Sequence, residues 1–274
     1  MRDPISPRQE GHARVLHRCN KSPFFRVFRV PSPPPYTLLR RGLDNAARSG
    51  IYTPPPSRYH PAPLTARDRE ILVALTLKTR LLSLDQIART WWKPTDSGRN
   101  EARKRMTELA AHGLVERRRM NIHPELPLGN PLLAWEPGDE DPNFGAIAYR
   151  LKIRWKESLR LTPFFTASKH GVKHFGGSRS AGGRLKRPHQ VTHDLHVAAL
   201  YLRFLQADPT AANAWTLDHH LTTERKNQKL PDAVLKNPDG RDGRVIEFGG
   251  AYPARRVEAF HEDCLRRSLP YELW

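Results

Sequence analysis

Cysteine and long apolar runs are scarce in this chain. Only two cysteines, Cys19 and Cys264, occur in 274 residues, which excludes a disulfide framework or a local metal knuckle and favours a reducing, cytoplasmic setting. No run of about 18 apolar residues is present, which argues against a membrane span. The first 30 residues lack the apolar stretch of a secretory signal. We therefore expect a soluble protein with no membrane partner.

Acidic residues are few relative to basic ones. The chain holds 46 Lys and Arg against 28 Asp and Glu, a formal net charge of +18. A surplus of this size destabilises a compact state by self-repulsion and is typical of proteins that bind a polyanion. Double-stranded DNA is therefore the first partner to consider. A ribosomal, membrane-peripheral or merely well-solvated basic protein is the alternative.

The N-terminal segment is the richest in proline and in net positive charge. Residues 1–62 contain 11 of the 25 prolines, with 11 basic and 3 acidic side chains. The proline runs at 33–35 and 54–56 lack backbone donors and favour extended polyproline geometry. We expect a disordered basic arm that either touches nucleic acid or is an extension without specific function. An organelle transit peptide is a third interpretation.

A helical pattern of apolar residues begins at Leu64. Thr65 is an N-cap candidate for a first helix over 66–78, and Ser83 is one for a second helix. This second helix must end before Pro94, because the residue that precedes a proline avoids helical geometry. A folded unit therefore begins here.

The third predicted helix spans 99–112 and ends at Gly113, and a strand-like run with three arginines follows it directly. Three short helices and a basic strand form the order of a winged helix-turn-helix, which we place at residues 63–156. In such a unit the third helix enters the major groove, and arginines of the wing contact phosphate. The residues predicted to bind DNA are Arg99, Asn100, Arg103, Lys104, Thr107, Arg117, Arg118 and Arg119.

Two other interpretations of this segment stay open. The charged helix can be a solvated face held by i, i+4 ion pairs such as Glu101 with Arg105 or Lys104 with Glu108. Winged helices that bind proteins share the same order of elements, so a protein-interaction adaptor is a further hypothesis.

The connecting segments give weaker signals. The proline-rich stretch 124–142 is expected to be a long wing or linker. Loose alternation over 147–155 predicts a strand that leads to the second domain. Residues 157–192 are expected to be a basic, Gly-rich linker region rather than a nucleotide-binding loop, because no Gly-Lys-Ser/Thr follows a strand.

Residues 193–274 predict a second domain of α/β type. Thr192 is an N-cap candidate for a well-buried helix, and a later helix carries Val257, Phe260 and Cys264 on one side. The strand-like runs are 215–217, 232–235, 245–248 and 271–274. The resulting order, α-β-β-β-α-β, is that of a restriction-endonuclease-like core. The whole chain is then a two-domain protein of α+β or α/β class.

Carboxylates in this second domain suit metal-dependent cleavage of a phosphodiester. Asp232 follows Pro231, and Glu247 lies fifteen residues further on, so paired strands would bring the two carboxylates together. Hydrolysis with Mg²⁺ needs two or three converging carboxylates and a lysine near the attacking water. Asp194 on the first helix is the third candidate ligand. The enzyme hypothesis is thus a Mg²⁺-dependent DNA endonuclease or nickase.

The expected lysine is missing from its usual place. Gly249 stands two residues after Glu247, where the motif has lysine, and Lys229 or Arg255 is the nearest substitute. We therefore favour a nuclease-like scaffold that has lost catalysis and binds DNA over an active enzyme.

Histidines form the second metal hypothesis. His189, His193 and His196 approximate i, i+4, i+7 spacing, and the Asp-His-His run at 218–220 follows. These residues suit Zn²⁺ or Mn²⁺. The expected cap at Thr192 places His189 before the helix, so we prefer a structural role for His193 at the helix start.

Taken together, these motifs resemble the replication-relaxation family of plasmid and mobile-element proteins over residues 63–274. The resemblance rests on segment 64–119, the run 193–196, and the pairs of motifs at 231–232 and 246–248. It implies a DNA-binding winged helix joined to a nuclease-like domain, with replication or mobilisation proteins as possible partners. Family members often have an acidic residue shortly after the equivalent of Glu247, where this chain has two glycines.

Overall fold

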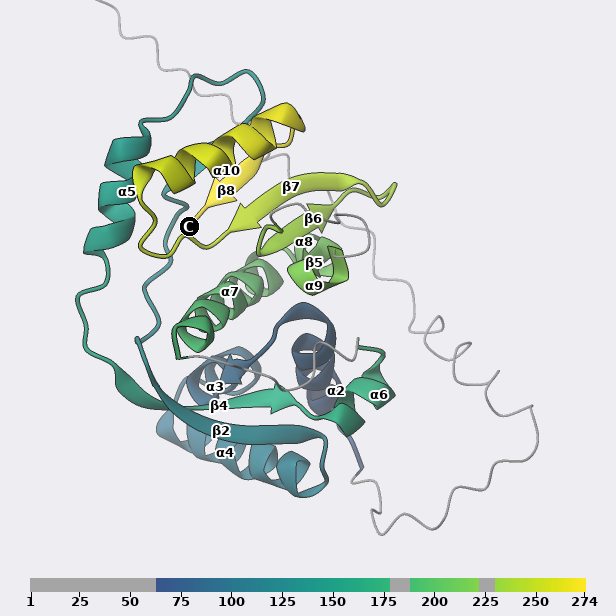
Figure 1. The fold of residues 1–274 in the computed structure, drawn as a ribbon. Coiled ribbons are helices and arrows are strands. Elements are labelled where there is room, and N and C mark those ends of the chain that lie inside the picture. Colours follow the sequence, from purple (N-terminus) through teal and green to yellow (C-terminus); the bar gives the residue numbers. More distant parts are fainter. Residues whose placement is uncertain (1–62, 178–187, 222–229) are drawn as a thin grey trace, which may run out of the picture. The chain divides into compact units, whose positions relative to one another are not determined.

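The described part of the chain is of mixed α+β type and contains two β-sheets (Figure 1). The residues that the computed structural model describes are 63–177, 188–221 and 230–274. They belong to one compact unit, residues 58–274. The basic arm predicted over 1–62 lies outside the described residues.

The first sheet has the strand order β1-β4-β2, and both pairings are antiparallel. Its strands and the helices that precede them are α2 (Ala66–Val73), a π-helical turn (Ala74–Lys78), β1 (Leu82–Ser83), α3 (Leu84–Trp91), α4 (Asp96–Ala111), β2 (Val115–Ile122) and β4 (Arg160–Ala167). The three helices and the arginine-containing strand predicted from the sequence are thereby confirmed.

Side-chain caps explain where these helices begin. The side-chain oxygens of Thr65 and Ser83 each accept a hydrogen bond from the backbone N–H of the third residue of their helix. The side chain of that third residue accepts a hydrogen bond from the backbone N–H of Thr65 or Ser83 in turn. α4 begins at Asp96, earlier than predicted, because Thr95 also acts as a cap. Gly113 ends α4 with φ of 69°, a left-handed conformation that favours glycine.

Two elements lie between β2 and β4, namely β3 (Leu133–Trp135) and α5 (Phe144–Ile153). The predicted strand over 147–155 is wrong, because Asn143 caps a helix there. The buried residues of this helix, Ile147 and Leu151, are one turn apart. β3 pairs with β8 (Tyr271–Leu273) of the second sheet, so the long connection contributes an edge strand to the C-terminal half.

The linker region predicted over 157–192 is instead largely structured. It contains β4, the central strand of the first sheet, and α6 (Lys169–Phe175). Phe164 and Phe165 fill opposite faces of that sheet, because successive side chains of a strand alternate. Residues 178–187, with most of the predicted glycine-rich charge, lie outside the described residues.

The second sheet has the order β3-β8-β7-β6-β5, in which β7 and β8 are parallel and the other pairs antiparallel. The C-terminal elements are α7 (Pro188–Ala207), α8 (Pro209–Ala214), β5 (Trp215–Leu217), α9 (Asp218–Leu221), β6 (Ala233–Lys236), β7 (Asp242–Glu247), α10 (Ala254–Arg266) and β8 (Tyr271–Leu273). The predicted order α-β-β-β-α-β is observed, with two short helices added.

α7 starts before the predicted cap. It begins at Pro188, whose fixed φ suits the first turn of a helix, so Thr192 and His189 lie inside it. The backbone oxygen of Thr192 is 2.7 Å from Nδ1 of His196, one turn later. The predicted N-cap role of Thr192 is therefore wrong.

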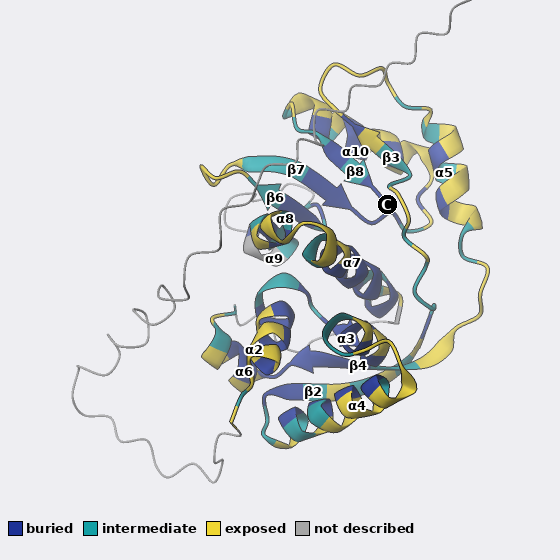
Figure 2. Cartoon of the chain, turned by 180° about the vertical axis from the view of Figure 1, so that it is seen from behind, coloured by how far each residue is buried: buried dark blue, intermediate teal, exposed yellow. Residues whose placement is uncertain are grey.

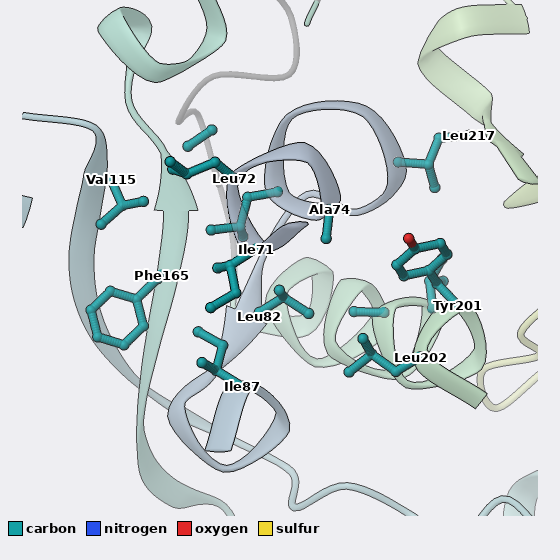
Figure 3. Packing of buried hydrophobic residues seen from close by; sticks show 14 of the residues in the cluster. Ile71, Leu72, Ala74, Leu82, Ile87, Val115, Phe165, Tyr201, Leu202 and Leu217 are labelled. Atoms are coloured by element: carbon teal, nitrogen blue, oxygen red, sulfur yellow. The ribbon is translucent and has the colours of Figure 1, made fainter. Parts of the chain in front are cut away.

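α7 is the element that both halves share, since it lies between the two sheets (Figure 1). Its residues Val191 and Leu195 pack with Ile122 and Phe164 of the first sheet. Tyr201 and Leu202 belong to a large cluster that also contains residues of both halves (Figure 3). The labelled members include Ile71, Leu82, Phe165 and Leu217. The boundary predicted at residue 156 therefore does not separate two hydrophobic cores.

Candidate functional site

The outward side of α4 is basic but narrower than predicted. Figure 2 shows that α4 has a largely exposed outer side. Arg103 and Lys104 are exposed residues of this helix and form no ion pair with any described residue. Arg99, by contrast, is paired with Asp85 at 2.5 Å between Nε and Oδ1. Two of the predicted positions thus offer free charge on this helix.

The remaining predicted positions on α4 are polar and make local bonds. Nη1 of Arg103 donates to Oδ1 of Asn100 at 2.9 Å. The hydroxyl of Thr107 donates to the backbone oxygen of Arg103 at 2.8 Å. Both side chains are exposed, so they border the basic residues without adding charge.

The three arginines of β2 divide between the two faces of the first sheet. Arg117 and Arg119 are exposed and lie on the same face as Val115, which packs in one cluster with Ala102 and Met106 of α4. The two arginines therefore face the side of the sheet that carries α4. Arg118 points to the opposite face and is 2.5 Å from Glu116. We call Arg103, Lys104, Arg117 and Arg119 the basic face.

Arg105 is an anchor of α4 that sequence patterns do not reveal. Its Nη2 lies 2.7 Å from Oδ2 of Asp68, a buried residue of α2, and its Nη1 lies 2.8 Å from Glu108. Burial alone would raise the pKa of Asp68, but hydrogen bonds from Arg105 and Thr65 lower it. The contact partner at Asp68 is distant in sequence, whereas the expected pair with Glu101 is not formed.

In the C-terminal half, strand pairing brings Asp232 and Glu247 together as predicted. Ala233 pairs with Ile246, and this register sets Asp232 beside Glu247. The backbone N–H of Asp232 donates to Oε2 of Glu247 at 3.3 Å. The other carboxylate oxygen of Glu247 accepts from the hydroxyl of Tyr252 at 3.0 Å.

The side chain of Glu247 is enclosed. Glu247 is only 2% exposed. Burial, followed by the negative charge of Glu247, raises the pKa of the Tyr252 hydroxyl, which stays protonated and can donate. Both oxygens of Glu247 are thus engaged by groups of the chain itself.

Asp232 is held by a backbone amide and by His193. Its Oδ2 accepts from the backbone N–H of Phe248 at 2.7 Å and lies 3.1 Å from Nε2 of His193. The other ring nitrogen, Nδ1, is 3.5 Å from Oδ1 of Asp194. Burial would lower the pKa of His193, but the two carboxylates outweigh it and raise the pKa to about 11. The two flanking carboxylates therefore favour the charged imidazolium form of His193.

Arg80 enters the same region from the connection before β1. Its Nη2 is 2.5 Å from Oδ2 of Asp218. Burial by itself would lower the pKa of Arg80, but the negative charges of Asp218, Asp194 and Asp232 raise it. No sequence signal links Arg80 to these residues, because the contact spans 138 positions.

These side chains line a pocket of about 140 Å³, which we call the carboxylate pocket. Its lining residues are Arg80, Gln190, His193, Asp194, Val197, Leu217, Asp218 and Asp232. Three carboxylates and two cations meet here. One oxygen of Asp194, Oδ2, is buried and has no hydrogen-bond partner.

The site has no lysine at the position that the nuclease motif requires. A Cβ added at Gly249 would come within 2.6 Å of Leu151 on α5, so a side chain there points into packed helix. The backbone oxygen of Gly249 accepts a hydrogen bond from Arg154. Lys229 lies outside the described residues, and Arg255 is exposed on α10.

The donor set does not fit Mg²⁺ as the described side chains stand. Oδ2 of Asp232 and both carboxylate oxygens of Glu247 already accept the hydrogen bonds above. Residues 63–177, 188–221 and 230–274 contain no group of three or more His, Cys, Asp or Glu placed to hold a metal ion. A hard divalent cation takes six or more oxygen ligands, several of them from the protein or substrate.

The histidines do not form the predicted Zn²⁺ or Mn²⁺ site either, as far as their side chains are described. Nδ1 of His196 donates to the backbone oxygen of Thr192, and its Nε2 accepts from the backbone N–H of Leu126 at 3.0 Å. Burial lowers the pKa of His196 to about 4, so it is neutral and structural. His189 is exposed, and the side chains of residues 219 and 220 lie outside the described set.

Comparisons of the chain with protein-family models, curated proteins and solved structures found no match. The resemblance to the replication-relaxation family stays a prediction. Among the described residues, no helix is both long and apolar enough to cross a membrane.

Proposed function

We propose that the protein binds double-stranded DNA through the basic face of α4 and β2. The observation that carries the proposal is that four cations are exposed without ion pairs to described residues: Arg103 and Lys104 on α4, and Arg117 and Arg119 on the face of β2 whose Val115 packs with α4. Cations without internal partners are available to neutralise phosphates, and arginine also reads guanine in the major groove.

The order of elements supports a winged helix-turn-helix. Two helices with β1 between them lead to α4, and β2 and β4 follow as an antiparallel pair with β1 at the far edge. In that geometry α4 is the helix that enters the major groove, and β2 is the strand that leads to the wing. We infer a preference for particular DNA sequences, with Arg103 and Asn100 nearest to base edges.

The biological setting that we propose follows the family resemblance. The protein would act on bacterial plasmid or mobile-element DNA in the cytoplasm, in replication, mobilisation or its regulation. The C-terminal half, with the α-β-β-β-α-β order of a nuclease-like scaffold, would add a second contact surface rather than cleave. The Mg²⁺-dependent endonuclease or nickase is not favoured, because the carboxylates of Asp232 and Glu247 are already hydrogen-bonded within the chain.

A charge-reversal experiment tests the proposal. Filter binding to a duplex is measured over a series of salt concentrations for the wild type, for Arg103→Glu with Lys104→Glu, and for a control with the same charge change, Lys152→Glu with Arg241→Glu. The control residues are exposed on α5 and on the β6–β7 turn. We expect a loss on the order of tenfold or more for the α4 variant only, since an arginine base contact contributes about 1–3 kcal/mol.

Two results would contradict the proposal. Binding that does not weaken with rising salt would rule out phosphate-dominated recognition. Unchanged DNA binding in the α4 variant would favour the protein-interaction adaptor instead.

A further inference from the structure

We propose that the carboxylate pocket is a metal-free centre whose counter-cation is built into the chain, with His193 as the cation that bridges Asp232 and Asp194. The inference goes beyond DNA binding and does not depend on it. It explains why His193 lies between Asp232 and Asp194, where the sequence predicts a magnesium ion.

The position of His193 is the first argument. Its two ring nitrogens lie 3.1 Å from Oδ2 of Asp232 and 3.5 Å from Oδ1 of Asp194, so one side chain addresses both carboxylates. A group that lies between two carboxylates in this way holds the position of an ion that bridges them. Asp232 also accepts the Phe248 amide, which leaves Oδ2 with two donors.

The balance of charge is the second argument. Three aspartates line the pocket, and His193 and Arg80 supply two positive charges among them. A divalent cation added to this set would lie within a few ångströms of the imidazolium. Like charges at such close range repel strongly where water screens them little. The cation must therefore displace His193 before it can bind.

The unpartnered oxygen is the third argument. Oδ2 of Asp194 is buried without a hydrogen bond, so the ring satisfies Asp194 only in part. Removing the imidazolium leaves Asp194 and Asp232 as neighbouring carboxylates on a pocket of about 140 Å³, large enough for an ion with waters. Such a pair favours a cation, because like charges at close range are unfavourable. Without the imidazolium, the pocket therefore attracts a cation more strongly than it does in the wild type.

The test is a calorimetric titration of the full-length protein with Mn²⁺. Three forms are compared: the wild type, His193→Gln, which removes the charge, and His193→Lys, which keeps a charge near the same place. We expect no saturable binding to the pocket in the wild type or in His193→Lys. His193→Gln should bind Mn²⁺ saturably, with an affinity at least about tenfold above the weakest binding that the titration detects, because relief of 1.4 kcal/mol of repulsion suffices for that factor. Adding Asp232→Asn to His193→Gln abolishes the gain.

A second measurement keeps the test decisive if His193→Gln is less stable. A ligand that binds only the folded state raises the melting temperature, so Mn²⁺ should stabilise His193→Gln and leave His193→Lys unchanged. Saturable Mn²⁺ binding by the wild type that Asp232→Asn weakens would overturn the proposal. Equal Mn²⁺ responses in all three forms would overturn it as well.

Discussion

The basic face and the carboxylate pocket are both rich in charge, but among the described residues the charges are unpaired on the basic face and paired in the pocket. On α4 and β2, Arg103, Lys104, Arg117 and Arg119 extend into solvent without ion pairs to described residues. In the pocket, Asp232 has His193 and Asp218 has Arg80. A surface that leaves cations free is suited to an external polyanion. A pocket that supplies two cations for its three carboxylates has less need of an external ion.

The contrast has an energetic basis. Exposed charges are solvated, so leaving them unpaired costs little, and a surface ion pair adds only about 0–1 kcal/mol. A carboxylate in the interior without a partner costs far more, so the chain must supply donors for it. The net charge of +18 therefore says less about function than the distribution of partners does.

The substitution with the largest expected effect tests whether the basic face and the carboxylate pocket belong to halves that share one hydrophobic core. Leu200 of α7 is fully buried in the cluster that spans both halves. Leu200→Ala should lower the free energy of unfolding by about 2–5 kcal/mol. Because α7 is shared, urea unfolding followed by tryptophan fluorescence and by circular dichroism should give one coincident transition. Two separated transitions would show that the two halves unfold independently, as separate domains.

Restoring the missing lysine is the next largest perturbation. Gly249→Lys should destabilise by about 1–3 kcal/mol or more, since the added Cβ overlaps Leu151, and it should confer no plasmid nicking with Mg²⁺. Melting temperature and a supercoiled-plasmid assay measure the two outcomes. Nicking gained by this variant, and lost again with Asp232→Asn, would show that the pocket needs only a lysine to become a nuclease centre.

A pH series sharpens the difference between free and neutralised charge. The pKa of His193 is raised in the folded state from an ordinary value of about 6.5, so its stabilising contribution is complete below pH 6.5 and is lost as pH rises toward 11. His193→Gln should therefore lower the free energy of unfolding by about 1–2 kcal/mol at pH 6 and by less at pH 9. Urea titrations at both pH values measure this, and a pH-independent difference would contradict the ion bridge.

The smallest effect distinguishes neighbours on β2. Arg117→Ala with Arg119→Ala should reduce the slope of log affinity against log salt by about 2, because each phosphate contact contributes about 0.9. Arg118→Ala should leave the slope nearly unchanged, since Arg118 lies on the other face beside Glu116. Equal effects of the two changes would mean that the face of the strand does not matter.

Local signals predicted much of the fold because they act over a few residues. Thr65, Ser83 and Gly113 mark helix ends through short-range hydrogen bonds and backbone preference, and all three act as predicted. The segment 147–155 was misassigned as a strand because two buried residues one turn apart are a weak periodic signal. β4 was missed because its polar flanks hide a pair of buried phenylalanines.

The candidate sites divide in the same way. Pairing of adjacent strands made the approach of Asp232 to Glu247 predictable. The roles of Arg80 and His193 were not, because they depend on how the start of α7 and the connection before β1 pack in three dimensions. The ion pairs of Arg99 and Arg118 were likewise not predicted, although the partner Asp85 lies on the preceding helix α3 and the partner Glu116 lies two positions away on β2.

The salt dependence of duplex binding, compared between the wild type and the variant with alanine at Arg103, Lys104, Arg117 and Arg119, tests the central claim most directly. If Lys104, Arg117 and Arg119 contact phosphate while Arg103 lies at a base edge, the slope of log affinity against log salt should become shallower by about 2.7 in the variant, at roughly 0.9 per phosphate contact. An equal slope in both proteins would show that the DNA contacts lie elsewhere and would contradict the account.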